Sequence, residues 1–324
     1  MASSRGTLDQ PSDQDRYTTV VRAAWLYYKD NLTQAEIAER LFVSRATVGR
    51  LLDIAREEGI VRFEISADHL SALELSTRLR DGFGLLDAVV VPRILATGSP
   101  DQVNGRVAAA AAEYLGRFLR PGAVIGVGWG DTVLRVLFAL SRYALDGVTI
   151  ASVAGGIDVY TREVTARNTN GVNEHLRAIP APLLASSAAI AEALREDASV
   201  RSVLALASQA VATLTGIGSA DVGTASAVRA GLYTAEEVVA LRAAGGVGDM
   251  LGEWFDRSGA VVPAESSGRR IGITLDELRA LPNVIGVAGG VEKTDAIAGA
   301  LRGRYLDVLV TDEGTAEALL TRTT

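Results

Sequence analysis

The part of the sequence best suited to bind an anion is a glycine-rich segment that follows an apolar run. Residues 124–127 read Val-Ile-Gly-Val and residues 128–132 read Gly-Trp-Gly-Asp-Thr, a pattern typical of a strand that leads into a helix. Glycines let backbone N–H groups approach a ligand, and a helix N-terminus is partly positive. The pattern predicts a cradle for a phosphate ester, although a glycine-rich turn can also serve packing alone. The predicted cradle residues are Gly128, Gly130, Asp131 and Thr132.

Three more loops carry glycine after an apolar run, at residues 154–156, 216–219 and 288–294. Ligands of open parallel sheets bind beyond the carboxyl ends of the strands, so we expect these loops to meet at one edge. Lys293 would pair with a phosphate and Asp249 would accept hydrogen bonds from sugar hydroxyls, although an isolated Lys or Asp is usually a solvated surface charge. These loops add the candidates Gly155, Gly156, Gly218, Ser219 and Lys293, and the segment 246–250 adds Asp249.

Metal and nucleophile chemistry find little support in the residue types. The chain has no cysteine, which excludes disulfides, thiolate nucleophiles and thiolate metal sites. His69 and His175 stand far apart, with no partner at the spacing of metal ligands or of a catalytic triad. The sequence therefore predicts no metal site, no catalytic residue and no cofactor.

A second pattern, near the start of the chain, is typical of a protein that reads DNA. Residues 33–36 have the Thr-x-x-Glu form that caps a helix start, and Ser44 would cap the next helix after a turn at residues 42–43. Arg45, Thr47 and Arg50 would lie on the exposed side of that last helix and reach base edges and phosphates. The predicted DNA-binding residues are Thr33, Gln34, Ser44, Arg45, Thr47 and Arg50.

The spacing of apolar residues predicts the helices and the strand of this DNA-binding domain, called the reader below. A first helix would bury Val21, Ala24, Trp25 and Tyr28, and the last would bury Val48, Leu51, Leu52 and Ala55. Alternation over residues 60–65 predicts a strand that serves as the wing of a winged helix-turn-helix. The alternative is a plain three-helix bundle with no nucleic-acid role.

From about residue 67 apolar runs alternate with helical stretches, which predicts an α/β domain with a parallel sheet. We expect a disordered leader at 1–15, the DNA-binding domain at 16–66 and the larger domain at 67–324. The net charge of −7 argues against unspecific DNA coating, and no apolar run is long enough to span a membrane, so we expect a cytoplasmic protein. The predicted strands are 88–91, 124–127, 148–153, 211–217, 271–274, 284–287 and 308–311.

The order of these motifs resembles the SorC family of sugar-binding transcriptional regulators, over nearly the whole chain. The resemblance is carried by residues 32–38 and 44–48 in the reader, and by 128–132, 216–219, 248–250 and 288–293 in the larger domain. It implies a domain similar to sugar-phosphate isomerases and glucosamine-phosphate deaminases without their activity, and a phosphorylated sugar or polyol as effector. It also implies a homodimer or homotetramer on a double-stranded DNA operator.

The resemblance further implies how the effector is held and what it does. Some members bind an aldehyde sugar through a lysine at the position of Ala154, so we expect reversible binding here unless Lys293 supplies the amine. Effector binding would change the spacing of two readers and so shift operator affinity.

Two rival functions stay open. An active sugar-phosphate isomerase or deaminase would use Asp249, Glu253 and Asp312 as acid and base, although no histidine or carboxylate pair lies in the predicted loops. The larger domain could also be an oligomerisation module that binds no ligand.

Overall fold

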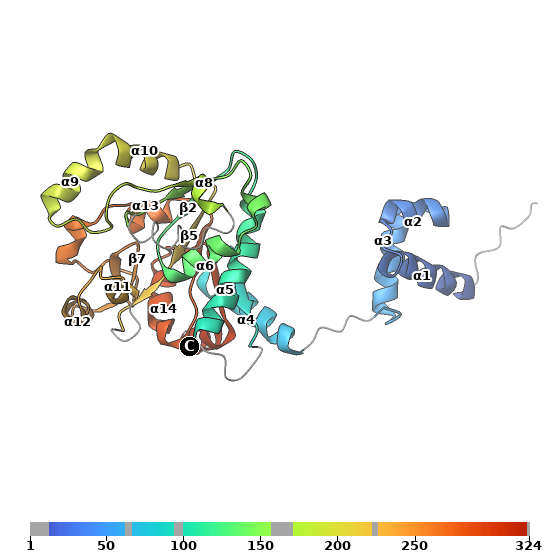
Figure 1. Cartoon of the computed structure of the whole chain (residues 1–324). Helices are drawn as coiled ribbons and strands as arrows, with labels where there is room; N and C mark the ends of the chain where they lie inside the picture. Colours follow the sequence, from blue (N-terminus) through green and yellow to red (C-terminus); the bar gives the residue numbers. More distant parts are fainter. Residues whose placement is uncertain (1–12, 62–66, 94–99, 157–170, 222–225, 323–324) are drawn as a thin grey trace, which may run out of the picture. The chain divides into compact units, whose positions relative to one another are not determined.

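The computed structural model divides the chain into two compact units, residues 1–66 and 67–324. Figure 1 traces the whole chain. The structure describes residues 13–61, 67–93, 100–156, 171–221 and 226–322.

The first unit is built from three helices whose starts are fixed by side chains. Thr33 and Glu36 form a reciprocal capping box at the second helix, and the Ser44 hydroxyl caps the third by accepting a hydrogen bond from the Thr47 amide. Both caps were predicted, because this chemistry is local in sequence. The helices are α1 (Asp13–Tyr28), α2 (Gln34–Leu41) and α3 (Arg45–Glu57).

The core of this unit confirms the predicted buried face of α3 and corrects that of α1. Val48, Leu51, Leu52 and Ala55 are all buried. On α1 the buried side chains are Val20, Ala23, Ala24 and Leu26, whereas the predicted Val21 and Trp25 are exposed. Because α1 packs against α3, its alanines allow a close approach that Trp25 would prevent. The helix also begins at Asp13, inside the predicted leader, and residues 62–65 of the predicted wing lie outside the described residues.

The second unit is organised around a seven-stranded sheet in which every neighbouring pair of strands is parallel. Val308 and Val310 face one core and Leu309 the other, which is the alternation expected of a strand covered on both faces. In spatial order the strands are β1 (Asp87–Val91), β10 (Val308–Asp312), β9 (Val284–Val287), β5 (Ala212–Gly216), β2 (Val124–Val127), β3 (Thr149–Ser152) and β4 (Leu176–Arg177).

A second, antiparallel sheet of three short strands stands at the edge of this unit and was not predicted. Residues 246–250, which are not among the predicted strands, form its central strand. The predicted strand at 271–274 was wrong: Gly272 makes a single bridge to Ala154, and Thr274 caps the next helix. The strands are β6 (Gly218–Ser219), β7 (Gly246–Met250) and β8 (Glu253–Asp256).

Helices cover both faces of the large sheet, as the alternating pattern predicted. Side chains of α5 and α6 pack on one face, and those of α4, α13, α14 and α15 on the other. No helix among the described residues is long and apolar enough to cross a bilayer. The α-helices are α4 (Ala67–Phe83), α5 (Pro100–Leu115), α6 (Asp131–Ala139), α8 (Val172–His175), α9 (Ala188–Glu196), α10 (Ala198–Ala207), α11 (Ser226–Arg229), α12 (Ala235–Ala243), α13 (Leu275–Arg279), α14 (Thr294–Arg302) and α15 (Glu313–Thr321). The 3-10 helices are η1 (Gly116–Phe118), η2 (Arg142–Leu145), η3 (Glu265–Arg269) and η4 (Val291–Lys293).

Candidate functional site

The exposed side of α3 carries the charges that could meet DNA. Arg45 and Arg50 are both exposed, and neither forms an ion pair within the part of the chain that the structure describes. Arg56, one turn further on, is paired with Asp53 of the same helix. The first two turns of α3 therefore present the available positive charge, while its C-terminal end, with Glu57 and the cap residue Glu58, is net negative.

The hydroxyl groups predicted to contact DNA are already engaged in helix caps. Thr33 Oγ1 lies 2.7 Å from Glu36 Oε2, and Ser44 Oγ lies 2.8 Å from Thr47 Oγ1. Gln34, at the first position of α2, is partly buried. The contact of these side chains with a DNA backbone stays a prediction.

The turn between α2 and α3 contains a strained residue. Phe42 has φ 56° and ψ 41°, a left-handed conformation that costs a residue with a Cβ about 1–2 kcal/mol, and its side chain is 95 % exposed. Since no burial is lost, Phe42→Gly should stabilise α2 and α3 by about 1 kcal/mol after the added flexibility of the unfolded chain is deducted.

Hydrogen exchange of the α2 and α3 amides measures this change. Asn31→Gly is the matched control, because Asn31 also has a positive φ of 55° and asparagine tolerates that conformation. Slower exchange in Phe42→Gly than in Asn31→Gly is expected, and exchange as fast as in the unsubstituted protein would contradict the prediction.

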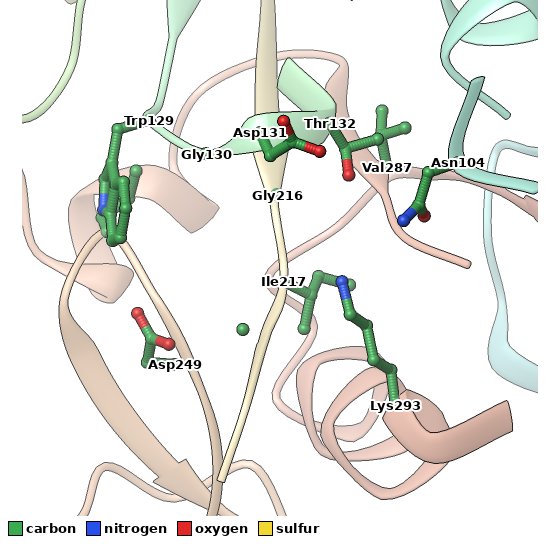
Figure 2. A pocket seen from close by; sticks show the side chains of 12 residues that line it. Asn104, Trp129, Gly130, Asp131, Thr132, Gly216, Ile217, Asp249, Val287 and Lys293 are labelled. Atoms are coloured by element: carbon green, nitrogen blue, oxygen red, sulfur yellow. The ribbon is translucent and has the colours of Figure 1, made fainter. Parts of the chain in front are cut away.

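In the larger unit a pocket opens where β2, β5 and β9 end, with β7 along one side (Figure 2). Its position at the carboxyl ends of parallel strands is the one expected for ligand binding in such sheets. The residues that line it are Asn104, Trp129, Gly130, Asp131, Thr132, Gly216, Ile217, Gly218, Asp249, Leu251, Val287 and Lys293.

The start of α6 forms one wall of the pocket. Gly130 has φ 136° and ψ 153°, a conformation that only glycine adopts readily, and it leads into the first turn of the helix. The amide groups of that turn have no partner within their own helix, and the dipole makes this end partly positive. In Figure 2 the Thr132 hydroxyl points into the same space. An anion placed here would meet several N–H donors.

The Asp131 carboxylate is engaged by an arginine of its own helix. Arg135 donates from Nε to Asp131 Oδ2 at 2.8 Å and from Nη2 to Asp101 Oδ1, on α5, at 2.6 Å. These hydrogen bonds raise the pKa of the guanidinium. The negative charge of Asp131 is thereby offset, so its backbone amide is better suited than its side chain to meet an anion.

Opposite this wall lies a buried carboxylate. Asp249, on β7, is 4 % exposed, and its loss of solvation raises its pKa to about 6 even though the Gly252 amide donates a hydrogen bond to it at 3.3 Å. Gly218 on β6 faces it, and a Cβ at that position would collide with the carboxylate. Attraction by Lys293 works in the opposite direction and lowers the pKa of Asp249.

Four of the predicted effector residues do not line the pocket. Gly128, Gly155 and Gly156 donate their amide hydrogens to the carbonyl oxygens of Leu214, Ile271 and Ala181 respectively. The Ser219 hydroxyl accepts a hydrogen bond from the Asp221 amide. The glycines at 155 and 156 are buried, and Pro182 lies too close to Gly155 for any side chain there, so that loop serves close packing.

Six lining residues had not been selected from the sequence, and Asn104 is the most informative of them. It belongs to α5, a helix whose sequence gave no sign of a binding role. Its Oδ1 atom is buried and has no hydrogen-bond partner among the described residues. The others are Trp129, Gly216, Ile217, Leu251 and Val287, which stand in or next to the predicted loops.

Comparisons with known proteins identify the kind of domain in each part of the chain. Residues 68–321 match the family described as "Putative sugar-binding domain", and residues 23–69 match the MarR family. The transcriptional regulator LsrR of Enterobacter sp. (strain 638) is 38 % identical over 304 residues, covering 93 % of this chain and 92 % of LsrR. LsrR of Escherichia coli (strain K12) is 36 % identical over 305 residues, covering 93 % and 94 %.

The fold comparison points the same way. The full-length sorbitol operon regulator SorC of Klebsiella pneumoniae superposes with a TM-score of 0.70 at 31 % identity, over 95 % of this chain and 99 % of SorC. Both a helix-turn-helix and a sugar-binding domain are therefore shared along almost the full length. This chain belongs to the SorC family of sugar-binding transcriptional regulators.

Proposed function

We propose that the pocket at the carboxyl ends of β2, β5 and β9 binds a phosphorylated sugar or polyol, and that this binding controls the affinity of the protein for its operator. The observation that carries the proposal is the combination, around one pocket, of a helix N-terminus, the Lys293 ammonium and the buried Asp249 carboxylate. The first two suit a phosphate, and the third suits sugar hydroxyl groups.

The pocket is large enough for the phosphate group of the ligand but not for the whole phosphosugar. The enclosed space is about 50 Å³, enough for a few water-sized groups and far below the 300–1,000 Å³ of typical ligand pockets. A phosphate group fits against the start of α6, with Thr132 and Lys293 beside it. A complete phosphosugar requires the walls to move apart, and such a movement is a route by which ligand binding would reach the DNA-binding unit.

We infer that the pocket binds its ligand without catalysing its conversion. Of the three acid or base candidates, Asp249 alone lines the pocket. Glu253 accepts a hydrogen bond from the Leu275 amide, and Asp312 accepts hydrogen bonds from the Gly290 amide and the Thr315 hydroxyl. Isomerisation needs a second positioned acid or base, and neither Glu253 nor Asp312 supplies one at the pocket. Conversion of ribose 5-phosphate or glucosamine 6-phosphate by the purified protein would contradict this inference.

A thermal-shift screen tests the proposed effector class. Phosphorylated sugars and polyols that bind should raise the melting temperature of the sensor unit, whereas their unphosphorylated counterparts should not. Lys293→Met should weaken binding by about tenfold, since a charge-assisted hydrogen bond is worth about 1.5–3 kcal/mol.

The other lysine provides a matched control. Lys29→Met, in the DNA-binding unit, removes the same charge and should leave the shift unchanged. A ligand identified in this way is then added to a gel-shift assay with operator DNA. No shift with any phosphosugar would favour a ligand-free oligomerisation module instead.

We further propose that the protein acts as a homodimer or homotetramer on a nearly palindromic operator. Two copies of α3 held at a fixed spacing would read two half-sites, and the effector would change that spacing. Sedimentation of the protein with and without operator DNA measures the number of copies bound.

A further inference from the structure

A second cavity, larger than the effector pocket, is lined by residues of α10 and α13 in the same unit. Its volume is about 610 Å³, within the range of pockets that hold small organic molecules. It shares no lining residue with the effector pocket. Much of its wall is apolar, with Leu204 and Ala207 on one side and Ile273, Ala280 and Leu281 on the other.

One end of this cavity is charged. Arg270 is 5 % exposed, and burial lowers the pKa of its guanidinium. Its Nη2 atom stands 3.8 Å from Glu253 Oε2, beyond hydrogen-bond distance, while Nη1 donates to the Ile273 carbonyl oxygen at 2.5 Å. Arg195 of α9 reaches the same end and donates to the Arg270 carbonyl oxygen at 2.6 Å.

Donors exceed acceptors at this end. A guanidinium has five N–H donors, and the hydrogen bonds among the described residues use one from Arg195 and one from Arg270. The carboxylates of Glu253 and Glu277 balance the two guanidinium charges, and Glu253 forms a long ion pair with Arg270, but the hydrogen bonds among the described residues run to them from the backbone amides of Leu275 at 2.6 Å and Thr274 at 2.7 Å and not from a guanidinium. The remaining guanidinium donors are therefore available to the oxygen atoms of an acidic group from outside the chain.

We propose that this cavity is a second ligand site, for a small organic carboxylate with an apolar body. The carboxylate pairs with Arg270 and Arg195, and the body packs against the apolar walls contributed by α10 and residues 273–281. The site also has a physical link to the effector pocket. Asp249, on β7, lines the effector pocket, and Glu253, on β8, lines the second cavity. A ligand in either site therefore contacts the same β7–β8 hairpin.

Titration calorimetry with hexanoate as the probe tests the site, with the neutral hexanamide as its uncharged counterpart. Hexanoate should bind at least about tenfold more tightly than hexanamide, which lacks the charge that the arginines recognise. Arg195→Gln should remove most of that difference. Ser208→Trp should block the cavity, because Ser208 is exposed and lines its mouth.

Two further variants locate the binding. Ser202→Trp adds the same bulk to an exposed position of α10 outside the cavity, and Lys293→Met disables the effector pocket; both should bind hexanoate normally. The proposal fails if the unsubstituted protein does not bind hexanoate, or if Ser208→Trp binds it equally well. It fails as well if Ser208→Trp changes the number of copies in sedimentation, because the groove then lies between subunits.

Discussion

Replacing Arg45 and Arg50 together with alanine should lower operator affinity by about a hundredfold or more. A good contact from arginine to a base edge is worth about 1–3 kcal/mol, and these are the exposed arginines in the first two turns of α3. Because neither side chain is buried or ion-paired within the described residues, the fold should keep its stability to within about 0.5 kcal/mol. A gel-shift titration at fixed salt measures the affinity, and circular dichroism verifies the helices.

Arg56→Ala is the control for this experiment. Arg56 belongs to the same helix, but its charge is offset by Asp53, so its removal should change operator affinity much less. If the double variant binds the operator as well as the unsubstituted protein, α3 is not the reading helix. A smaller dependence of affinity on salt in the double variant would further indicate that these arginines also contact phosphates.

Asp249→Asn should make the unliganded protein more stable at pH 7 and, at the same time, weaken effector binding by about tenfold to a hundredfold. Burial raises the pKa of Asp249 from 3.8 to about 6, so the folded state carries a charge that is costly at neutral pH. A difference of about two pKa units corresponds to a stability gain of about 3 kcal/mol at most. Asparagine keeps an acceptor for the Gly252 amide but loses the charge that, in the proposed function, strengthens hydrogen bonds from sugar hydroxyls.

The stability difference between Asp249→Asn and the unsubstituted protein should depend on pH. Below about pH 4 Asp249 is protonated in both folded and unfolded chains, and the substitution should have little effect. As the pH rises from about 4 to about 6 the unfolded chain ionises first, so the unsubstituted protein loses stability relative to the variant. Above about pH 6 the difference should be constant. Melting curves of both proteins between pH 4 and pH 8 measure it.

Asp256→Asn, on the same hairpin, should behave in the opposite way. Hydrogen bonds led by that from the Ser258 hydroxyl lower the pKa of Asp256, so its ionised form stabilises the folded chain. The substitution should destabilise the protein at neutral pH, and the effect should fade as the pH falls. Equal melting behaviour of the two variants would show that burial of Asp249 is not the cause.

Local chemistry explains which parts of the fold were predictable. The caps at Thr33 and Ser44 depend on residues three positions away, and the buried strands at 124–127 and 308–312 stand out as β-rich apolar runs bounded by turn signals. The face of α1 was not predictable in the same way, since two overlapping stripes share Ala24. The choice between them is made by the space beside α3, which is a tertiary property.

The residues of the candidate site also differ in whether local sequence or tertiary packing places them there. Gly130, Asp131 and Thr132 follow a strand directly, so their place at the sheet edge was evident from chain order. Asn104 reaches the pocket only because α5 packs against α6, a contact that sequence spacing does not encode. The glycines at 155 and 156 have the same local pattern as the binding loop, but close approach to Pro182 accounts for one of them. The β7 strand, rich in glycine, lacks the apolar alternation that identifies strands.

The placement of Lys293 gives the protein a built-in chemical reporter. The sequence contains two lysines, and one of them stands in the wall of the effector pocket while the other belongs to the DNA-binding unit. An acylating reagent therefore has a single side-chain amine to modify in residues 67–324. The mass added to the peptide that contains it would measure occupancy of the pocket directly, without a fluorescent label or an operator.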